Sequence, residues 1–268
     1  MGAPVNGSET VHEVHESRIF TLIARSGWVV TGLLHVIIGA LAIAVAFGDR
    51  RARPDEVGAF EAIAAAPLGP VLLVAVIVSL VGLGVWMLAD AILNGGPMHR
   101  WTSGVASAAQ GLVYLALAVP PGILLFGGDL QSGRNSRALS RFLLDSAAGA
   151  VVLVLVGVGI AVGGVYFIVK GIRRRFSWEL RPMTERRGRA VRALGAVGYV
   201  ARGIAFLLLA GLIVVEAIQV DPNDVTGLAG ALGALRRGFL GEFWLASIGV
   251  GLIIYGIYGF ARARLAKI

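Results

Sequence analysis

The stretch that decides the fold reads Gly82-Leu-Gly84-Val-Trp86-Met-Leu-Ala-Asp90, and the same pattern returns twice further along the chain. The second copy is Val162-Gly-Gly164-Val-Tyr166-Phe-Ile-Val-Lys170, and the third is Ile254-Tyr-Gly256-Ile-Tyr258-Gly-Phe-Ala-Arg262. Each copy has a glycine, an aromatic residue two positions later and an ionisable residue four positions beyond it. A further glycine column has the same offsets between copies: Gly69, Gly149 and Gly241. Such a regular internal repeat predicts one structural unit built three times.

Each copy lies in, or at the end of, one of six apolar segments that dominate the composition. Hydrophobic residues make up 57% of the 268 residues and charged residues only 15%, against about 45–50% and about 25% in a typical soluble domain. A helix needs roughly 20 apolar residues to cross about 30 Å of hydrocarbon. Six segments meet this requirement: 26–47, 68–92, 104–126, 148–170, 194–218 and 243–261. The sequence therefore predicts an all-α integral membrane protein with six transmembrane helices.

The six segments form three pairs, which define repeats at about 25–95, 101–175 and 191–264. Because each repeat has an even number of spans, all three copies enter the membrane in the same orientation. We therefore expect three parallel two-helix repeats in a pseudo-threefold bundle about an axis along the membrane normal. Residues 25–264 form one predicted membrane domain, which follows a polar tail of residues 1–24. A short amphipathic stretch inside each pair is expected to lie in the membrane interface: 58–63, 137–142 and 232–239.

Glycine is unusually frequent, at 38 residues, in this apolar chain. Helices associate within lipid largely through van der Waals contact, and small residues let two backbones approach closely. One glycine column runs through the second helices of the pairs and another runs through the first helices. We predict that both columns mark helix contacts: Gly32, Gly111 and Gly203 in the first helices, and Gly84, Gly164 and Gly256 in the second helices.

Basic residues are divided unevenly between the two sides of the predicted bundle. One side carries 15 of the 24 lysine and arginine residues, and the other carries 8. By the positive-inside rule, this difference places both termini of the predicted multi-pass protein in the cytoplasm. The densest basic run joins the second and third repeats and includes Arg173, Arg174, Arg175, Arg186, Arg187 and Arg189. These side chains either bind anionic lipid headgroups or serve only to fix the topology.

Few polar side chains fall inside the predicted spans. His35 is ten residues into the first span, and at 1.5 Å per residue it lies about 15 Å deep, near the midplane. An ionisable group at that depth is a candidate for a functional site. The alternative is packing, because the equivalent positions hold the aromatic residues Tyr114 and Phe206. We define a candidate intramembrane polar site by four residues: His35, Gln110, Tyr114 and Arg202.

The ionisable column at the ends of the second helices holds Asp90, Lys170 and Arg262. These residues are expected either to form an ion-pair ring about the pseudo-threefold axis or to extend toward the lipid headgroups. We also expect Arg202 to pair with Asp90 rather than with a phosphate.

The sequence contains none of the common catalytic or cofactor motifs. It has no phosphate-binding loop, no serine nucleophile elbow and no carboxylate-rich metal cluster. The lack of cysteine excludes disulfides, thiolate metal sites and iron–sulfur clusters. The net charge of +8 falls in the loops of a membrane bundle and not on a recognition module, which argues against nucleic acid. We therefore expect no enzymatic activity, no cofactor, no metal and no nucleic acid partner.

The first helices add a motif of their own. The first and third repeats open with Gly27-Trp28-Val-Val-Thr31-Gly32 and Gly198-Tyr199-Val-Ala-Arg202-Gly203, whereas the middle repeat has Ala106-Ser107 in place of the glycine and aromatic. With the stretch Ala62-Ile-Ala-Ala-Ala-Pro67-Leu-Gly69 and the second-helix pattern, the chain resembles the DUF1206 family over about residues 18–264. This family comprises bacterial, largely actinobacterial, membrane proteins, so the resemblance implies a multi-pass protein of the bacterial plasma membrane. The resemblance implies the three-repeat architecture and supplies no activity or catalytic residues.

These observations favour a non-enzymatic membrane protein, structural or accessory in type. Its expected partners are membrane lipids, including anionic lipids, or a membrane protein. The alternative is a small permease or channel with a pathway along the pseudo-threefold axis, lined by the four residues of the polar site. A continuous polar path to the midplane would favour transport, whereas a closed apolar axis would favour lipid or partner binding.

Overall fold

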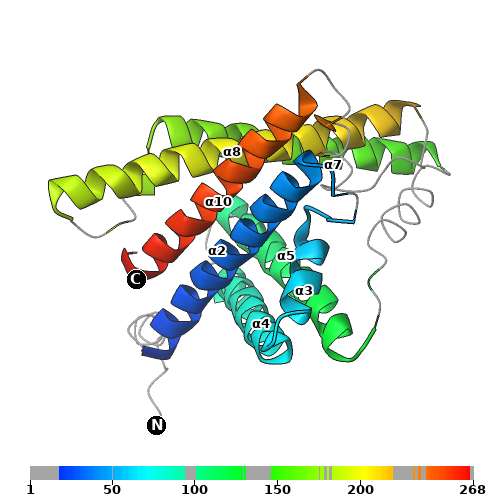
Figure 1. The fold of residues 1–268 in the computed structure, drawn as a ribbon. Helices are drawn as coiled ribbons and strands as arrows, with labels where there is room; N and C mark the ends of the chain where they lie inside the picture. Colours follow the sequence, from blue (N-terminus) through cyan, green and yellow to red (C-terminus); the bar gives the residue numbers. More distant parts are fainter. Residues whose placement is uncertain are drawn as a thin grey trace, which may run out of the picture.

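The computed structural model describes residues 18–49, 51–93, 101–128, 130, 146–174, 176–177, 180, 183–219, 232, 235–236 and 240–265, and within them the chain is all-helical. Six of the described helices are long and apolar enough to cross a membrane: α2 (Arg18–Ala46), α4 (Gly69–Leu93), α5 (Trp101–Leu125), α7 (Ala147–Ile172), α8 (Glu185–Gln219) and α10 (Gly241–Leu265). A short helix, α3 (Glu56–Ala64), separates α2 from α4 (Figure 1). The predicted all-α fold with six spans is confirmed. Residues 1–17 of the predicted tail and the stretch 137–142 lie outside the described residues.

The helices that pack most closely come from neighbouring repeats and not from the same repeat. Helix α4 packs along α5, α7 along α8, and α10 along α2, so the last helix of the chain returns to the first. The α2–α10 pair is antiparallel, because Gly32 lies opposite Gly256 and Gly39 lies opposite Gly249. Between the pairs, α8 packs on α10 and, less extensively, α2 on α4. Each repeat is therefore joined to the next by a contact between the second helix of one repeat and the first helix of the other.

The two glycine columns lie at the contacts within these three helix pairs, and all six glycines are buried. A Cβ atom built on Gly84 would lie 3.0 Å from the carbonyl oxygen of Gly111, and one on Gly111 would lie 2.9 Å from that of Gly84. A Cβ on Gly164 would lie 2.9 Å from the carbonyl oxygen of Gly203. In the third pair, a Cβ on Gly32 would lie 2.8 Å from the carbonyl oxygen of Gly256. Backbones this close leave no room for a side chain, so each first-helix glycine meets a second-helix glycine of the adjoining repeat.

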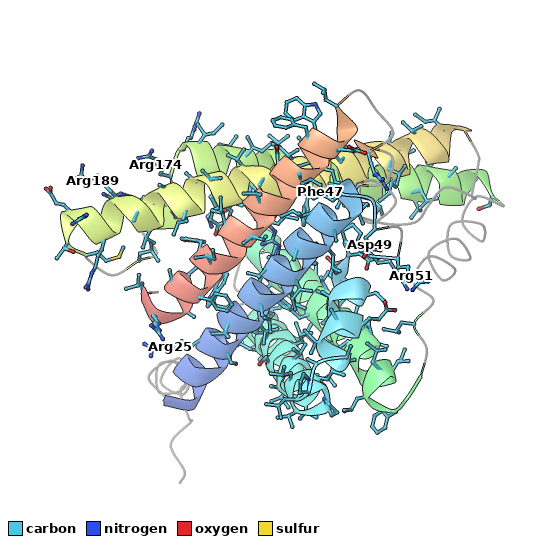
Figure 2. The ribbon with its side chains drawn as sticks, viewed as in Figure 1. Arg25, Phe47, Asp49, Arg51, Arg174 and Arg189 are labelled. Atoms are coloured by element: carbon cyan, nitrogen blue, oxygen red, sulfur yellow. The ribbon has the colours of Figure 1, made fainter. Side chains whose placement is uncertain are left out.

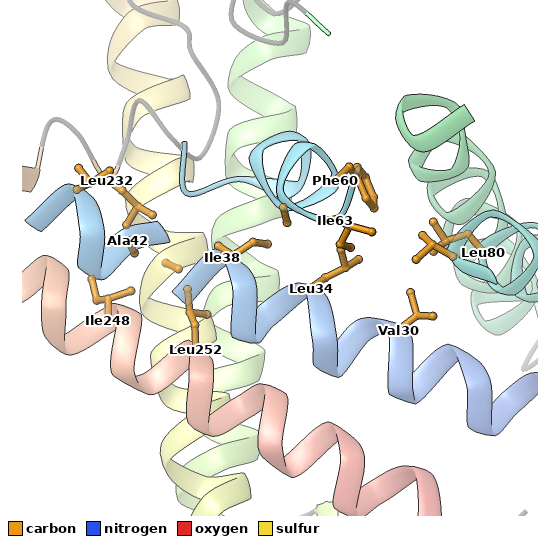
Figure 3. Close-up of a cluster of buried hydrophobic side chains, with 14 of the residues drawn as sticks. Val30, Leu34, Ile38, Ala42, Phe60, Ile63, Leu80, Leu232, Ile248 and Leu252 are labelled. Atoms are coloured by element: carbon orange, nitrogen blue, oxygen red, sulfur yellow. The ribbon is translucent and has the colours of Figure 1, made fainter. Parts of the chain in front are cut away.

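Helix α3 is held against the bundle by its apolar face and its N-cap. The Asp55 side chain accepts a hydrogen bond of 2.7 Å from the backbone N–H of Gly58, which satisfies one free donor of the first turn. Phe60 and Ile63 are buried in one cluster with Leu34 of α2 and with residues of α4 and α10 (Figure 3). The predicted amphipathic stretch 58–63 is thus a helix that packs onto α2.

Helix α8 begins nine residues before the span predicted at 194–218. Its 35 residues correspond to about 52 Å at 1.5 Å per residue, which exceeds the roughly 30 Å of the hydrocarbon core. The extra turns begin with Glu185 in the first turn, where an acidic side chain is favoured by the helix dipole. They consist mainly of arginine, alanine and other good helix formers. Hydropathy locates only the apolar part of such a helix, which explains the difference.

Candidate functional site

Arg202 places a fixed positive charge within the apolar span of α8, next to the glycine contact at Gly203. Its Nη1 donates a hydrogen bond of 2.6 Å to the hydroxyl of Tyr255 on α10. The guanidinium carbon lies 4.6 Å from the centroid of the Phe167 ring, 5.4 Å from that of Phe206 and 5.0 Å from that of Tyr255. Aromatic faces attract a cation, and these three come from α7, α8 and α10. The Nε atom of Arg202 is buried and has no hydrogen-bond partner among the described residues.

His35 of α2 packs against the same tyrosine. The ring centroids of His35 and Tyr255 are 4.7 Å apart, and the two planes are tilted by 60°. Nδ1 of His35 lies 2.7 Å from the backbone carbonyl oxygen of Thr31. A carbonyl oxygen only accepts, so Nδ1 carries a proton and donates this bond. Both contacts suit an aromatic ring packed at a helix interface, which is the packing alternative left open by the sequence.

Glu56 is the acidic residue whose field reaches Arg202. It is the first residue of α3, follows the N-cap Asp55, and is half-buried. Burial raises the pKa of Glu56 above its ordinary value, and a hydrogen bond from its own backbone N–H lowers that pKa again in part. The negative charge of the adjacent Asp55 raises the pKa of Glu56 further, while the positive charge of Arg202 lowers it. Helix α3, which packs against α2, α4 and α5, therefore carries a half-buried acid with a raised pKa.

The four residues predicted to form one polar site fall into two groups. Arg202 and His35 meet at Tyr255, as described above. Gln110 is exposed on α5, and its Nε2 donates a bond of 3.4 Å to the hydroxyl of Tyr114. Tyr114 in turn packs against the apolar cluster around α2 and α3. Among the described residues, no contact joins Gln110 or Tyr114 to Arg202, so the four do not line one continuous path by direct contact.

Two members of the predicted ionisable column meet at Tyr199, while the side chain of Asp90 lies outside the described part. Arg262 stacks on Trp28, with 3.6 Å from its guanidinium carbon to the ring centroid, and its Nη1 donates a bond of 2.8 Å to the Tyr199 hydroxyl. Nζ of Lys170 lies 5.2 Å from the centroid of the Tyr199 ring. These cations gather on aromatic rings. Arg202 bonds to Tyr255. Because the side chain of Asp90 is not described, the predicted pairing of Arg202 with Asp90 stays a prediction.

An aromatic cluster connects these two cation sites. The Tyr199 and Tyr255 centroids are 5.2 Å apart, Phe176 lies 5.3 Å from Tyr199, and Phe176 lies 5.2 Å from Tyr258. All four rings are buried. Tyr199 belongs to α8 and the other two tyrosines to α10, while Phe176 follows the end of α7. The cluster therefore fixes the segment after α7 against α8 and α10.

Five arginines of the predicted headgroup set are exposed at one end of the α7–α8 pair: Arg173, Arg174, Arg186, Arg187 and Arg189. Arg175 lies outside the described residues. Figure 2 shows Arg174 and Arg189 together at this end, on the same side of the molecule as Arg25 near the start of α2, and away from Phe47 and Arg51. This basic end, defined by these five arginines, lies beyond the aromatic cluster.

Sequence reasoning missed Glu56, Tyr255 and Tyr199 as parts of these sites. Tyr199 is the aromatic residue of the first-helix motif, whereas Tyr255 lies at a position that is not aromatic in the other repeats; neither pattern shows which cation each ring meets. A signal was available for Glu56: it follows Pro54-Asp55, a helix start directly before an apolar stretch. Its position near Arg202 depends on how α3 folds back, which periodicity does not show.

Comparison with known proteins supports the repeat assignment. The sequence model of a family described as "Domain of Unknown Function (DUF1206)" matches residues 26–94, 105–174 and 197–266. A protein of Bacillus subtilis (strain 168), called "Uncharacterized protein YxxB", is 27% identical over 245 residues, which cover 89% of this chain and 88% of the relative. No solved structure matches the chain significantly. The three matched segments coincide with the three two-helix repeats.

Proposed function

The chain belongs to the DUF1206 family, and we propose that it is a non-enzymatic, multi-pass membrane protein that binds anionic lipid headgroups at the basic end of α7 and α8. The observation that carries this proposal is the set of five exposed arginines at one end of a closely packed helix pair. Arginine matches phosphate through a planar fork of N–H donors. The basic end therefore has the chemistry of a headgroup site.

The depth of the basic end supports the same proposal. Because α8 is about 20 Å longer than the hydrocarbon core, its first turns extend to the level of the lipid headgroups. Lys170 and Arg262 lie against Tyr199 at the inner edge of this region, and amphipathic aromatic rings are enriched at the membrane interface. In this proposal the arginines of the basic end lie at the level of the lipid phosphates, and Tyr199 lies closer to the hydrocarbon core.

The proposed orientation places the basic end in the cytoplasm. Anionic lipids give the cytoplasmic leaflet a negative potential that is worth about 1 kcal/mol for each basic residue near the surface. Thr184, just before α8, and Phe126, just after α5, lie at opposite ends of the helices and are exposed. In this cysteine-free chain, Thr184→Cys should be shielded from an impermeant thiol reagent in intact cells, and Phe126→Cys should react. The reverse pattern would place the basic end outside.

Lipid selectivity is tested with the purified protein in nanodiscs of mixed phosphatidylcholine and phosphatidylglycerol. The enrichment of phosphatidylglycerol around the protein is measured by energy transfer from tryptophan to a labelled lipid. Arg186→Gln with Arg187→Gln should reduce the enrichment, because two headgroup contacts are lost. The control pair on the opposite side, Arg51→Gln with Arg236→Gln, should leave it near the wild-type value. An equal effect of the two pairs would mean that the basic end only sets topology.

A second function, a small permease, is favoured by one observation. A fixed charge within a span is costly and commonly marks a ligand or proton path, and Arg202 lies in α8 with Glu56 in electrostatic range. Flux of a carboxylate into proteoliposomes that depends on Arg202 would support transport. The division of the predicted polar set into two groups is the reason that we place this function second.

A further inference from the structure

The two helices of the middle repeat do not pack on each other as those of the other repeats do. In the third repeat α8 packs on α10, and in the first repeat α2 packs on α4. Among the residues that the structure describes, no comparable packing joins α5 to α7. Of the six described spans, those of α5 and α7 are also the least buried. The three helix pairs are therefore linked at two junctions, while the third, between α5 and α7, is left open.

One position of the repeat accounts for this difference. Tyr255 of α10 packs on α8, where a Cβ built on Gly198 would lie 2.6 Å from Cα of the tyrosine. The equivalent residue of the first repeat, Leu83 of α4, packs in the same way on Gly27 of α2. The middle repeat has Gly163 at this position, and no described atom lies within 4 Å of a Cβ built on it. Helix α7 therefore lacks the side chain that closes the other two junctions.

A second position, one helical turn away, shows the same difference. In the first repeat, Ser79 Oγ of α4 donates a hydrogen bond of 3.2 Å to Oγ of Ser26 on α2. In the third repeat, Gly251 of α10 lies directly against Ala201 of α8. The equivalent residue of α7 is Gly159, and a Cβ built there again has no described atom within 4 Å. Two successive turns of α7 are thus uncovered where the other repeats have a contact between helices.

The uncovered face of α7 is apolar. Val152 and Val156 precede Gly159 and Gly163 at spacings of three and four residues, which places all four on one side of the helix. The two valines are 46% and 48% exposed. By the repeat, this is the side that α7 turns toward α5. On α5, the described hydrogen bond of the exposed Gln110 stays within its own helix. The junction therefore offers a strip of apolar surface along α7.

We propose that this open junction binds an acyl chain of an anionic phospholipid whose headgroup lies at the basic end of α7 and α8. The inference rests on the proposed function for the headgroup. Lys170 continues the uncovered face, seven residues after Gly163, and Arg173 and Arg174 follow directly at the end of the helix. A phosphate bound there has its chains beside the apolar face. Cations at one end and apolar surface along the rest complement the charge distribution of such a lipid.

A lipid fits this surface better than a second copy of the chain does. Copies inserted in the same orientation would bring two sets of the same cations together at one end, and like charges across an interface cost affinity. A phosphate instead forms charge-assisted hydrogen bonds with these cations. The acyl chain also needs no hydrogen-bond partner, which suits a face of valine and glycine.

The test uses the purified full-length protein in phosphatidylcholine nanodiscs that contain a small fraction of phosphatidylglycerol with a photoreactive diazirine in the middle of one chain. After irradiation, the cross-linked residues are mapped by mass spectrometry. Labelling of α5 and of the uncovered face of α7 should saturate as the probe fraction rises, and unlabelled phosphatidylglycerol should displace it. Labelling of ordinary lipid-exposed faces should rise in proportion to the probe.

Filling the junction should remove the bound chain. Gly163→Leu, which copies Leu83 of the first repeat, should lower the saturable labelling about tenfold, because losing the burial of about two methylene groups has that effect on binding. The control is Gly211→Leu on α8, where the built Cβ also has no described atom within 4 Å, and it should leave the labelling near the wild-type value. The saturation of the wild type needs no variant, so it decides even where Gly163→Leu is unstable.

The outcomes separate this inference from the proposed function. Labelling without saturation, or labelling unchanged in Gly163→Leu, would overturn the chain site, while phosphatidylglycerol enrichment by energy transfer would still uphold the headgroup site. Equal saturable labelling by a phosphatidylcholine probe with the same diazirine would uphold the chain site and refute the headgroup site. A disulfide between two Gly163→Cys chains, in this otherwise cysteine-free protein, would mean that a second copy covers the junction and would overturn the lipid assignment.

Discussion

A single methyl group placed between α7 and α8 tests the packing on which the fold depends. In Gly164→Ala, the new Cβ would lie 2.9 Å from the carbonyl oxygen of Gly203 and 3.0 Å from Cγ of Leu207. Overpacking of this kind costs about 1–3 kcal/mol, while alanine in place of helical glycine gains about 1 kcal/mol. The control is Gly159→Ala on the same helix, where nothing lies within 4 Å of the built Cβ. Because the propensity gain is common to both, Gly164→Ala should be less stable than Gly159→Ala by about 1–3 kcal/mol.

The comparison is made by reversible unfolding in mixed micelles of a mild detergent and dodecyl sulfate, followed by circular dichroism. The midpoint of Gly159→Ala should equal or exceed that of the wild type, and the midpoint of Gly164→Ala should fall below that of Gly159→Ala. Equal midpoints would show that the Gly164–Gly203 contact is loose. The assignment of helix contacts between neighbouring repeats would then be wrong at this pair.

Three further outcomes follow from single side chains. Arg262→Met should destabilise the protein by about 2 kcal/mol, because it loses a charged hydrogen bond to Tyr199 and a cation–π contact with Trp28. The control is Arg264→Met, which changes an exposed arginine nearby and should cost under about 0.5 kcal/mol in the same assay. Glu56→Gln should raise the melting temperature at pH 8 and not at pH 4. Because the pKa of Glu56 is raised in the folded state, the folded protein holds this proton more tightly than the unfolded chain does. The wild type therefore loses stability as the pH rises from the unfolded to the folded pKa of Glu56. His35→Phe should keep the ring contact with Tyr255 and cost no more than about 1.5 kcal/mol, the scale of one hydrogen bond; a cost equal to that of His35→Ala would refute a packing role.

The elements of this fold were largely predictable, and their partners were not. Hydropathy located all six spans, because each must supply about 20 apolar residues. It placed the start of α8 too late, since the arginine-rich turns from Glu185 are helical without being apolar. The glycine columns indicated that close contacts exist. They did not show that Gly164 contacts Gly203 and that Gly84 contacts Gly111. A single sequence shows which residues recur, but it does not show which two of them are in contact.

The candidate site was less predictable than the fold, because it depends on the path of α3. Arg202 and His35 stood out as ionisable residues inside apolar spans. Nothing in the spacing of residues shows that α3 packs against α2, α4 and α5, or that Tyr255 lies between an arginine and a histidine. Such long-range placement is decided by the sum of many apolar contacts, among them those of Phe60 and Ile63 in the main buried cluster.

The internal repeat separates what holds the bundle together from what is particular to one place in it. Glycine occupies both contact columns in all three repeats, so the backbone contacts are the same at each junction. Arg202 has Thr31 and Gln110 as its equivalents, and Tyr255 has Leu83 and Gly163. The arginine and its tyrosine partner therefore occur once, in the third repeat, where α8 and α10 also pack on each other. A charge that served only to hold repeats together would be useful at all three junctions. Its restriction to the third repeat separates Arg202 from the glycine contacts that all three repeats share.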